Sequence, residues 1–206
     1  MTNNLIKEIY RKSFHLLILL IPTSYHFLGK WESVKIFSIF TTLILLIDIL
    51  RQKSDKFGHI FVKLFGKFLR EKEIKGDFCG TSYVGVAACL CFSLFKPEFA
   101  VTSFIILTIS DTLAAIFGKS LNSKEFFEKS TAGSIAFFTS GLIVMISSGI
   151  FYDVAIWFYI LGTFAVFVVT MFEARPSFIK IDDNFIIPVG FCIVMTLFDI
   201  ILNYQF

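Results

Sequence analysis

Seven apolar segments alternate with polar intervals along the 206-residue chain. Several of them approach the roughly 20 apolar residues that a helix needs to cross a hydrocarbon core of ~30 Å. The pattern therefore predicts an all-α fold, a polytopic membrane helical bundle of about seven transmembrane helices. The segments are 13–29, 34–50, 79–95, 99–118, 132–149, 154–172 and 186–202.

The longest polar interval, 51–78, contains a helical pattern of its own. Apolar residues recur at helical spacing on one face, and basic residues occupy the other. This arrangement predicts a basic amphipathic helix at about 55–70 that lies in the membrane interface. A solvated connector with accidental periodicity is the alternative. The apolar positions are Phe57, Ile60, Phe61, Leu64, Phe65 and Phe68, and the basic ones are Lys56, Lys63, Lys67 and Arg70.

Positive charge is sorted onto alternate polar intervals. All but three of the 19 Lys and Arg lie in the first, third, fifth and seventh intervals. Because short cytoplasmic loops carry the Lys and Arg excess, the N-terminus is predicted to be cytoplasmic and the C-terminus outside. The loops at 51–78, 119–131 and 173–185 then share the cytoplasmic side. The three exceptions are Lys30, Lys35 and Lys96.

Composition agrees with a membrane protein and excludes several other classes. Hydrophobic residues make up 56% of the chain, 28 residues are Phe, and the segments with their loops use up the whole length. We therefore expect one integral membrane domain over 1–206. The net charge of +3 follows membrane sidedness and forms no continuous patch, so a membrane surface is favoured as a partner and nucleic acid is not. None of the four cysteines forms a C-x-x-C pair, and all lie within or at the edge of apolar segments, so we interpret them as packing residues.

Three cationic or protonatable residues open the first segment. Arg11, Lys12 and His15 project within about a third of a turn of one another on a helix of ~100° per residue. Membrane anchoring by snorkelling side chains is one explanation. Anchoring has no use for an imidazole one turn inward, which favours a functional group.

Asp111 lies inside the fourth segment, where insertion of a central Asp costs about 2.5–3.5 kcal/mol. Acids at such positions usually face a polar cavity or a partner. Ala114, Ala115 and Gly118 follow on the same helical face and leave a shallow strip for a backbone or a ligand. The pattern suits a phosphate or metal site, and a helix-packing seam with a satisfied Asp is the alternative. Asp48 has no evident partner, and we interpret it as structural.

Two further polar groups border the cytoplasmic loops. Lys129, Ser130 and Gly133 open the fifth segment, where free amides and the helix dipole favour a phosphate. An ordinary Ser N-cap would look similar. The last loop carries the oxygen ligands that Mg²⁺ takes together with substrate phosphates, although solvated loop acids are common. These residues are Glu173, Asp182, Asp183 and Asn184.

Taken in order, these groups resemble the dolichol kinase, phytol kinase and CTP-dependent diacylglycerol kinase family, also called the polyprenol kinase family. The resemblance covers about residues 7–190, and no single motif is strong alone. The chain resembles a short, prokaryote-type branch of this family, which implies location in a prokaryotic inner or plasma membrane. The matching elements are Arg11-Lys12-x-x-His15, Ser110-Asp111-x-x-Ala114-x-x-x-Gly118, Lys129-Ser130-x-x-Gly133 and Glu173 followed by Asp182-Asp183-Asn184-x-x-x-Pro188.

The resemblance implies phosphorylation of a lipid alcohol with a nucleoside triphosphate, typically CTP, and Mg²⁺ as cofactor. Arg11, Lys12, Asp111 and Gly118 match residues that the family needs for activity, and 129–133 match its nucleotide-associated segment. Ser130 stands where dolichol kinases usually carry Thr, and the chain is far shorter than those enzymes. The acceptor thus stays open among polyprenol, diacylglycerol and phytol.

We expect Arg11, Lys12 and Lys129 to clamp phosphates, because phosphoryl transfer depends mainly on positioning and charge neutralisation. Asp111 with one or more of the last-loop acids would hold Mg²⁺ or orient the attacking hydroxyl, and the identity of the base stays open. The lipid would enter sideways from the bilayer. The sequence also leaves open a phosphatidate cytidylyltransferase that makes CDP-lipid, a small transporter or channel, and the oligomeric state.

Overall fold

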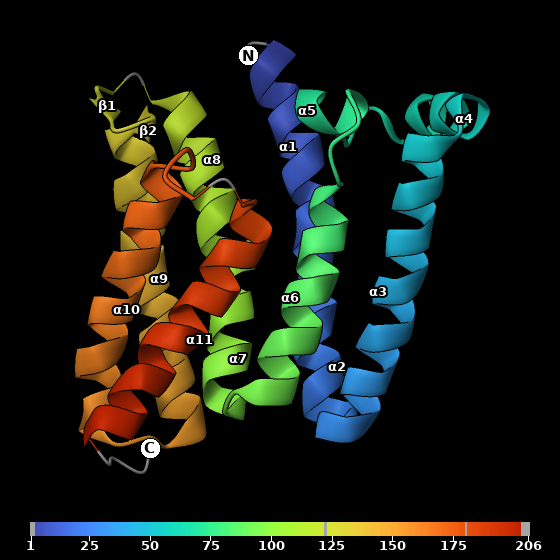
Figure 1. Cartoon of the computed structure of the whole chain (residues 1–206). Helices are drawn as coiled ribbons and strands as arrows, with labels where there is room; N and C mark the ends of the chain where they lie inside the picture. The colour runs from blue at the N-terminus through green and yellow to red at the C-terminus, as the bar shows by residue number, and fades with distance from the viewer. Residues whose placement is uncertain (1–2, 122, 180, 203–206) are drawn as a thin grey trace.

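The computed structural model describes residues 3–121, 123–179 and 181–202. Its long helices run side by side between two ends at which the connecting loops gather, and the termini lie at opposite ends (Figure 1). The helices and strands are α1 Asn3–His15, η1 Leu16–Leu19, α2 Leu20–Leu28, α3 Lys30–Lys53, α4 Asp55–Phe65, α5 Glu71–Ile74, α6 Gly80–Leu94, α7 Pro97–Ile105, η2 Ile106–Ser110, α8 Asp111–Ser120, β1 Glu125–Phe126, β2 Lys129–Ser130, α9 Thr131–Tyr152, α10 Ile156–Ala174 and α11 Asp183–Leu202.

The first apolar segment belongs to a longer helical run than the sequence pattern indicates. The run starts at Asn3, ten residues before the predicted segment, and passes through one 3₁₀ turn, η1, before α2. It stops at Gly29, whose φ of 76° suits a residue without a Cβ. Because α3 begins at the next residue, the two helices turn back on one another at the end of the bundle opposite the N-terminus (Figure 1).

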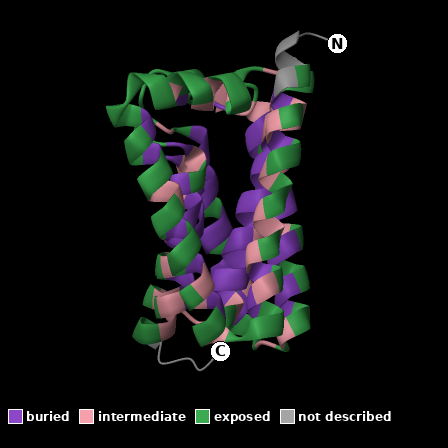
Figure 2. Ribbon diagram, turned by 90° about the vertical axis from the view of Figure 1, so that its right-hand side faces the viewer, coloured by how far each residue is buried: buried purple, intermediate pink, exposed green. Residues whose placement is uncertain are grey.

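The amphipathic helix exists but is shorter than predicted. The Ser54 hydroxyl accepts a hydrogen bond from the Phe57 amide at 3.4 Å and so caps α4. The helix ends at Phe65, before Gly66, and turns follow it instead of a further helical turn to residue 70. It lies across the end of the bundle (Figure 2).

The fourth long helix, Pro97–Ser120, contains a π turn at its centre. Residues Ile106–Ser110 form this turn, η2, and Asp111 follows it directly. A π turn inserts one extra residue into the helical path and occurs frequently at functional sites. Here it separates the buried apolar helix α7 from the polar start of α8.

The interior is packed by aromatic rings and by small residues. Phe92 of α6 lies 4.7 Å from Tyr25, 5.4 Å from Phe37 and 5.3 Å from Phe104 between ring centres. One ring therefore joins α2, α3, α6 and α7. Helix α6 also packs against α3 and α11, whereas α9 packs against α8 and α10.

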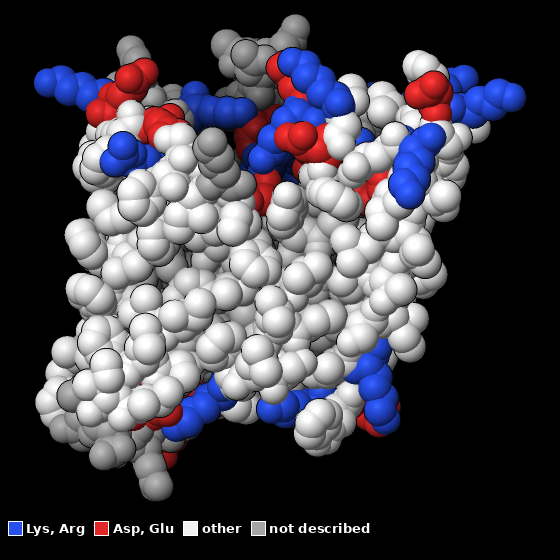
Figure 3. Space-filling view, in the orientation of Figure 1, with Lys and Arg blue, Asp and Glu red and all other residues white. Residues whose placement is uncertain are grey.

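The charged residues gather at the two ends of the molecule, and the visible face between them is uncharged (Figure 3). Five described helices are long and apolar enough to cross a membrane: α3, the helix Pro97–Ser120, α9, α10 and α11. Helix α6 is apolar but has only 15 residues. The chain is an integral membrane protein rich in α-helix, and the number of about seven spans stays a prediction. The two-residue strands β1 and β2 form an antiparallel hairpin that the sequence pattern does not predict.

Candidate functional site

The predicted site residues lie on segments that meet at the N-terminal end of the bundle, where Figure 3 shows a concentration of charge. These segments are α1, the start of α8, the hairpin, the end of α10 and the start of α11. The connection between α4 and α6 adds further charges to the same end. Residues far apart in sequence thus form a charged cluster, which is organised around three centres at Asp111, Lys129 and Asp182.

The first carboxylate is Asp111, which is 5% exposed. Its Oδ2 atom pairs with the ammonium group of Lys12, and the Lys12 side chain is almost completely buried. Nε2 of His15 lies 3.3 Å from the same oxygen and 3.2 Å from the carbonyl oxygen of Leu107. Because both neighbours of Nε2 are acceptors, the hydrogen of a neutral His15 must be on Nε2. Asp111 therefore holds two of the three residues that open the first helix.

The remaining residue of that group, Arg11, faces a different carboxylate. Arg11 pairs with Glu8 one turn earlier, and Glu8 also binds Lys119 of α8 at 2.6 Å. Glu8 thereby links α1 to α8. Its spacing of three residues from Arg11 is the sequence signal that indicates this pair.

The second carboxylate centre surrounds Lys129 of β2. Its ammonium group lies 2.5 Å from Glu173 and 3.3 Å from Asp183. Burial alone would lower the pKa of Lys129, but the carboxylates of Asp183 and Glu173 outweigh it and raise that pKa above its usual value. The other oxygen of Glu173, Oε2, is buried and has no hydrogen-bond partner among the described residues. Lys129 is thus a fixed positive charge between two acids from different helices.

The third carboxylate, Asp182, faces the connection between α4 and α6. Arg70 and Lys72 lie 2.5 Å and 3.0 Å from its Oδ2 atom, and Asn184 donates to Oδ1 through its amide side chain at 2.8 Å. Burial would raise the pKa of Asp182, but Arg70 and Lys72 hold it below its usual value. The sequence pattern places Arg70 on the basic face of the interfacial helix and indicates no other role for it. In the structure it closes the charged cluster.

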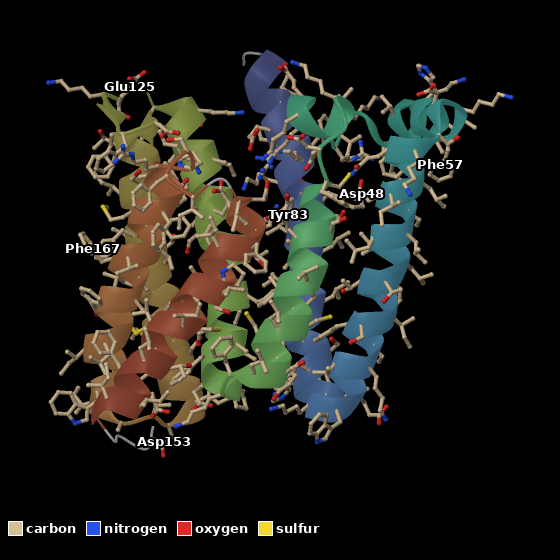
Figure 4. The ribbon with its side chains drawn as sticks, viewed as in Figure 1. Asp48, Phe57, Tyr83, Glu125, Asp153 and Phe167 are labelled. Carbon is tan, nitrogen blue, oxygen red and sulfur yellow. The ribbon has the colours of Figure 1, made fainter. Side chains whose placement is uncertain are left out.

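A buried polar network fixes the segment that carries Arg70. The Arg51 guanidinium donates to Asp48 at 2.7 and 2.9 Å and to backbone carbonyls of Glu73 and Asp77. The second oxygen of Asp48 accepts from the Cys79 amide at 2.7 Å. Asp48, labelled in Figure 4, therefore ties α3 to the connection before α6. The spacing of Asp48 and Arg51, three residues apart on a helix, is the signal for this pair.

The residues predicted to bind phosphate form a close helix contact. The Ser130 hydroxyl caps α9 by accepting from the Gly133 amide at 3.1 Å. A Cβ atom on Gly133 would lie 2.9 Å from the Ala114 carbonyl oxygen and 3.4 Å from Cα of Gly118. The small-residue strip of α8 is thus covered by the backbone of α9. Nearby, the Ser110 hydroxyl is buried without a described hydrogen-bond partner.

A cavity of about 830 Å³ adjoins the charged cluster. Its walls come from η1 and α2, α3, the interfacial helix α4, and α6, and they are almost entirely apolar. The apolar wall includes Phe14, Ile18, Phe37, Phe61, Phe65 and Val84. Its polar end is formed by Arg11, His15, Arg70, Glu73 and Asn184. Residues of the charged cluster therefore border a long apolar space.

The proposed metal ligands can be compared with this geometry. Within the described residues, no three His, Cys, Asp or Glu side chains are grouped so that they could hold a metal ion by themselves. Glu173 and Asp183 share one cation, Lys129, which shows that both carboxylates reach one point. Mg²⁺ commonly takes one or two carboxylates and completes its shell with phosphates and water. Two carboxylates are therefore enough for Mg²⁺ only where phosphates and water complete its shell and the Lys129 ammonium gives way.

A curated relative matches nearly the whole chain. No family model matches the sequence. The uncharacterized protein RP860 of Rickettsia prowazekii is 32% identical over 202 residues, which is 93% of this chain and 95% of that protein. The chain belongs to the family of RP860. No solved structure matches it.

Two further matches are to proteins named as lipid kinases, and each covers part of this chain. CTP-dependent diacylglycerol kinase 1 of Saccharomyces cerevisiae is 33% identical over 141 residues, covering 66% of this chain and 48% of the kinase. The protein of the same name from Eremothecium gossypii is 30% identical over 112 residues, or 53% of this chain and 34% of the kinase. The chain thus spans about half or less of the length of these kinases. The matches support a distant relationship to the family indicated by the sequence motifs.

Proposed function

We propose that this protein is a membrane lipid-alcohol kinase. It transfers the γ-phosphoryl group of a nucleoside triphosphate, with CTP preferred, to the hydroxyl group of a lipid at the cytoplasmic interface. The observation that carries the proposal is the apolar cavity of about 830 Å³ whose polar end contains Arg11 and His15 beside the Lys12–Asp111 pair. The partial similarity to CTP-dependent diacylglycerol kinases supports the same activity.

The cavity suits the chain of the acceptor lipid. Pockets of 300–1,000 Å³ with apolar walls and a few convergent polar groups are typical of small-molecule sites. The lining residues of the first helical run extend from Arg11 to Ser24, a span of about 20 Å at 1.5 Å per residue. A lipid chain in this space places its hydroxyl group beside His15 and Asp111. The acceptor is a polyprenol, a diacylglycerol or a phytol-like alcohol.

The charged cluster suits the phosphates of the donor. In this proposal Lys12, Arg11 and Lys129 neutralise phosphate oxygens, and Asp111 keeps Lys12 and His15 in place. Glu173 and Asp183 would hold Mg²⁺, which would supply further neutralisation of the charge that develops on the moving phosphoryl group. Positioning and electrostatics of this kind account for most of the catalysis of phosphoryl transfer.

The orientation in the membrane follows from the positive-inside charge distribution. We propose seven spans, with α1–α2 and α6 completing the five longer helices, a cytoplasmic N-terminus and an outside C-terminus. The cluster then faces the cytoplasm, where nucleoside triphosphates are available. Helix α4 would lie on the inner leaflet beside the opening of the cavity.

The position of the label in the product tests the proposal. Purified protein in detergent is given CTP labelled at the γ- or the α-phosphate, with diacylglycerol, a polyprenol or phytol as acceptor. A kinase moves only the γ-label into lipid and releases CDP. With phosphatidate as acceptor, transfer of the α-label and release of pyrophosphate would form CDP-lipid and identify a cytidylyltransferase. Cation flux in proteoliposomes without nucleotide turnover would identify a transporter or channel.

A further inference from the structure

The tip of the hairpin places a bulky residue in an unfavourable backbone conformation. Phe127 follows β1 and has a φ of 56°, in the left-handed region. For a bulky side chain this conformation is a genuine outlier, and it costs about 1–3 kcal/mol. The Phe127 side chain gains little burial in return, because the residue is 55% exposed. Strain of this kind clusters at ligand-binding sites.

The next cytoplasmic loop is bonded to this tip. The Glu128 amide donates to the Ala174 carbonyl oxygen at 3.1 Å, and the Glu128 carboxylate accepts from the Ser177 amide at 3.2 Å and from the Ser177 hydroxyl. These bonds bring Phe127 and Phe178 to the same guanidinium group. The ring centres of Phe127 and Phe178 lie 5.9 and 5.6 Å from Cζ of Arg175.

Both rings remain accessible in this arrangement, since Phe178 is 65% exposed. Two exposed aromatic rings beside an arginine form the kind of surface on which nucleic-acid bases stack. An arginine contributes a cation–π contact and carries donors only, which match the carbonyl oxygen and the unprotonated ring nitrogen of cytosine.

Phe127, Arg175 and Phe178 lie beside the charged cluster. Phe127 lies two residues before Lys129, and Arg175 lies two residues after Glu173. In Figure 1 the hairpin is at the same end as α4 but on the opposite side of α1, and Figure 4 labels Glu125 of this hairpin. The charged cluster thus lies between the apolar cavity and the aromatic residues. A donor with its γ-phosphate near the cavity has its base on the hairpin side.

We propose that Phe127, Arg175 and Phe178 form a base subsite, which binds the nucleobase of the phosphoryl donor by stacking and by hydrogen bonds from the guanidinium. This inference rests on the proposed function and assigns the donor's base to residues outside the predicted phosphate-binding set. Anchoring of the two rings in the membrane interface is the competing use of exposed aromatics. The strained turn and its bonds to Ser177 favour a preformed surface, because anchoring requires no fixed ring position.

The variant Phe127→Gly tests the base subsite with a built-in stability control. Glycine adopts positive φ at no steric cost, so the hairpin is expected to be at least as stable as before. Binding is measured in detergent by calorimetry with two probes, CTP and inorganic tripolyphosphate, which has no base. Stacking is worth about 1–3 kcal/mol per base, so the dissociation constant for CTP should rise roughly 5- to 150-fold. That for tripolyphosphate should not change.

Two further variants complete the test. Phe178→Ala approaches the subsite from the other loop and should weaken CTP binding in the same selective way. Phe27→Ala removes a ring that is 78% exposed at the end of α2 and should leave both dissociation constants unchanged.

Equal weakening of CTP and tripolyphosphate in the Phe127 and Phe178 variants would show that the loops position the phosphate site, and unchanged binding of both would leave anchoring as their role. Either result overturns the base subsite. So does an unmodified protein that binds CTP no more tightly than tripolyphosphate, or that binds neither probe. The γ-label transfer assay tests the kinase proposal separately. A kinase without a base subsite still transfers the γ-label to lipid, but it shows no preference for the base of the nucleotide.

Discussion

Removal of the Asp111 charge tests whether the buried pair with Lys12 has a catalytic role. Asp111→Asn preserves the volume of the side chain and its ability to accept hydrogen bonds. It leaves the Lys12 ammonium, which is 1% exposed, without its counter-ion. Breaking a buried pair by loss of one partner destabilises a protein by about 3–5 kcal/mol. The single variant is therefore expected to unfold more easily, whatever its effect on activity.

A double variant separates stability from catalysis. Lys12→Met combined with Asp111→Asn removes both charges and keeps an unbranched side chain in the space of Lys12. The single variant is destabilised because it leaves a buried charge without its partner, and the double variant leaves no such charge, so it should recover most of the lost stability. If the pair neutralises the phosphates and orients His15, activity should not recover. We expect kcat to fall by about 10²-fold or more, equivalent to ~2.7 kcal/mol of transition-state stabilisation.

Thermal unfolding in detergent and phosphoryl transfer to lipid are measured on the same preparations of the three proteins. Recovery of both stability and kcat in the double variant would show that the pair is a packing element and would refute its assigned role. A well-folded Asp111→Asn protein with most of its activity would refute it as well.

Three more predictions follow from the cavity, the charge distribution and Asp182. Replacing Phe61 and Phe65, which line the cavity, with Ser should raise the KM for lipid more than the KM for nucleotide; equal changes in both would indicate misfolding. Reporter fusions after Ser123 and at the C-terminus should report opposite compartments, and agreement between them would refute the topology. Because Arg70 helps to hold the pKa of Asp182 below its usual value, the stability that Asp182 contributes is present above about pH 4 and is lost as the pH falls further. Arg70→Gln should weaken that acid dependence in thermal unfolding, and an unchanged dependence would contradict it.

The sequence predicts the helices well where hydropathy decides them. The apolar face of α4 follows from residue spacing, and the free-energy cost of placing Asp111 in the membrane follows from solvation. The partner of Asp111 does not, since Lys12 is 99 residues away and the pairing depends on how α1 packs against α8. The ends of the helices differ from the predicted ones. Helix α4, for example, ends at Phe65 with Gly66 as its C-cap, before the predicted end at residue 70.

Other features were beyond sequence reasoning because they depend on tertiary packing. The cavity is lined by residues of the run from α1 to α2 and of α3, α4 and α6, and no periodicity encodes how these helices pack around it. The bonds between Glu128 and Ser177 are another example, because they join two loops 49 residues apart. Two missed contacts did have a signal: the pairs Glu8 with Arg11 and Asp48 with Arg51 both have helical spacing of three residues.

The central claim is tested most directly by the transfer of phosphate from γ-labelled CTP to a lipid alcohol in nanodiscs. ATP is compared as the donor, and the Lys12→Met, Asp111→Asn double variant serves as the blank. The account predicts labelled lipid formed in equal amount to the released CDP, faster turnover with CTP than with ATP, loss of turnover in EDTA and no product above background in the double variant. Lipid that stays unlabelled in the presence of γ-labelled CTP would contradict the site proposed for this protein. So would turnover that continues in EDTA or in the double variant.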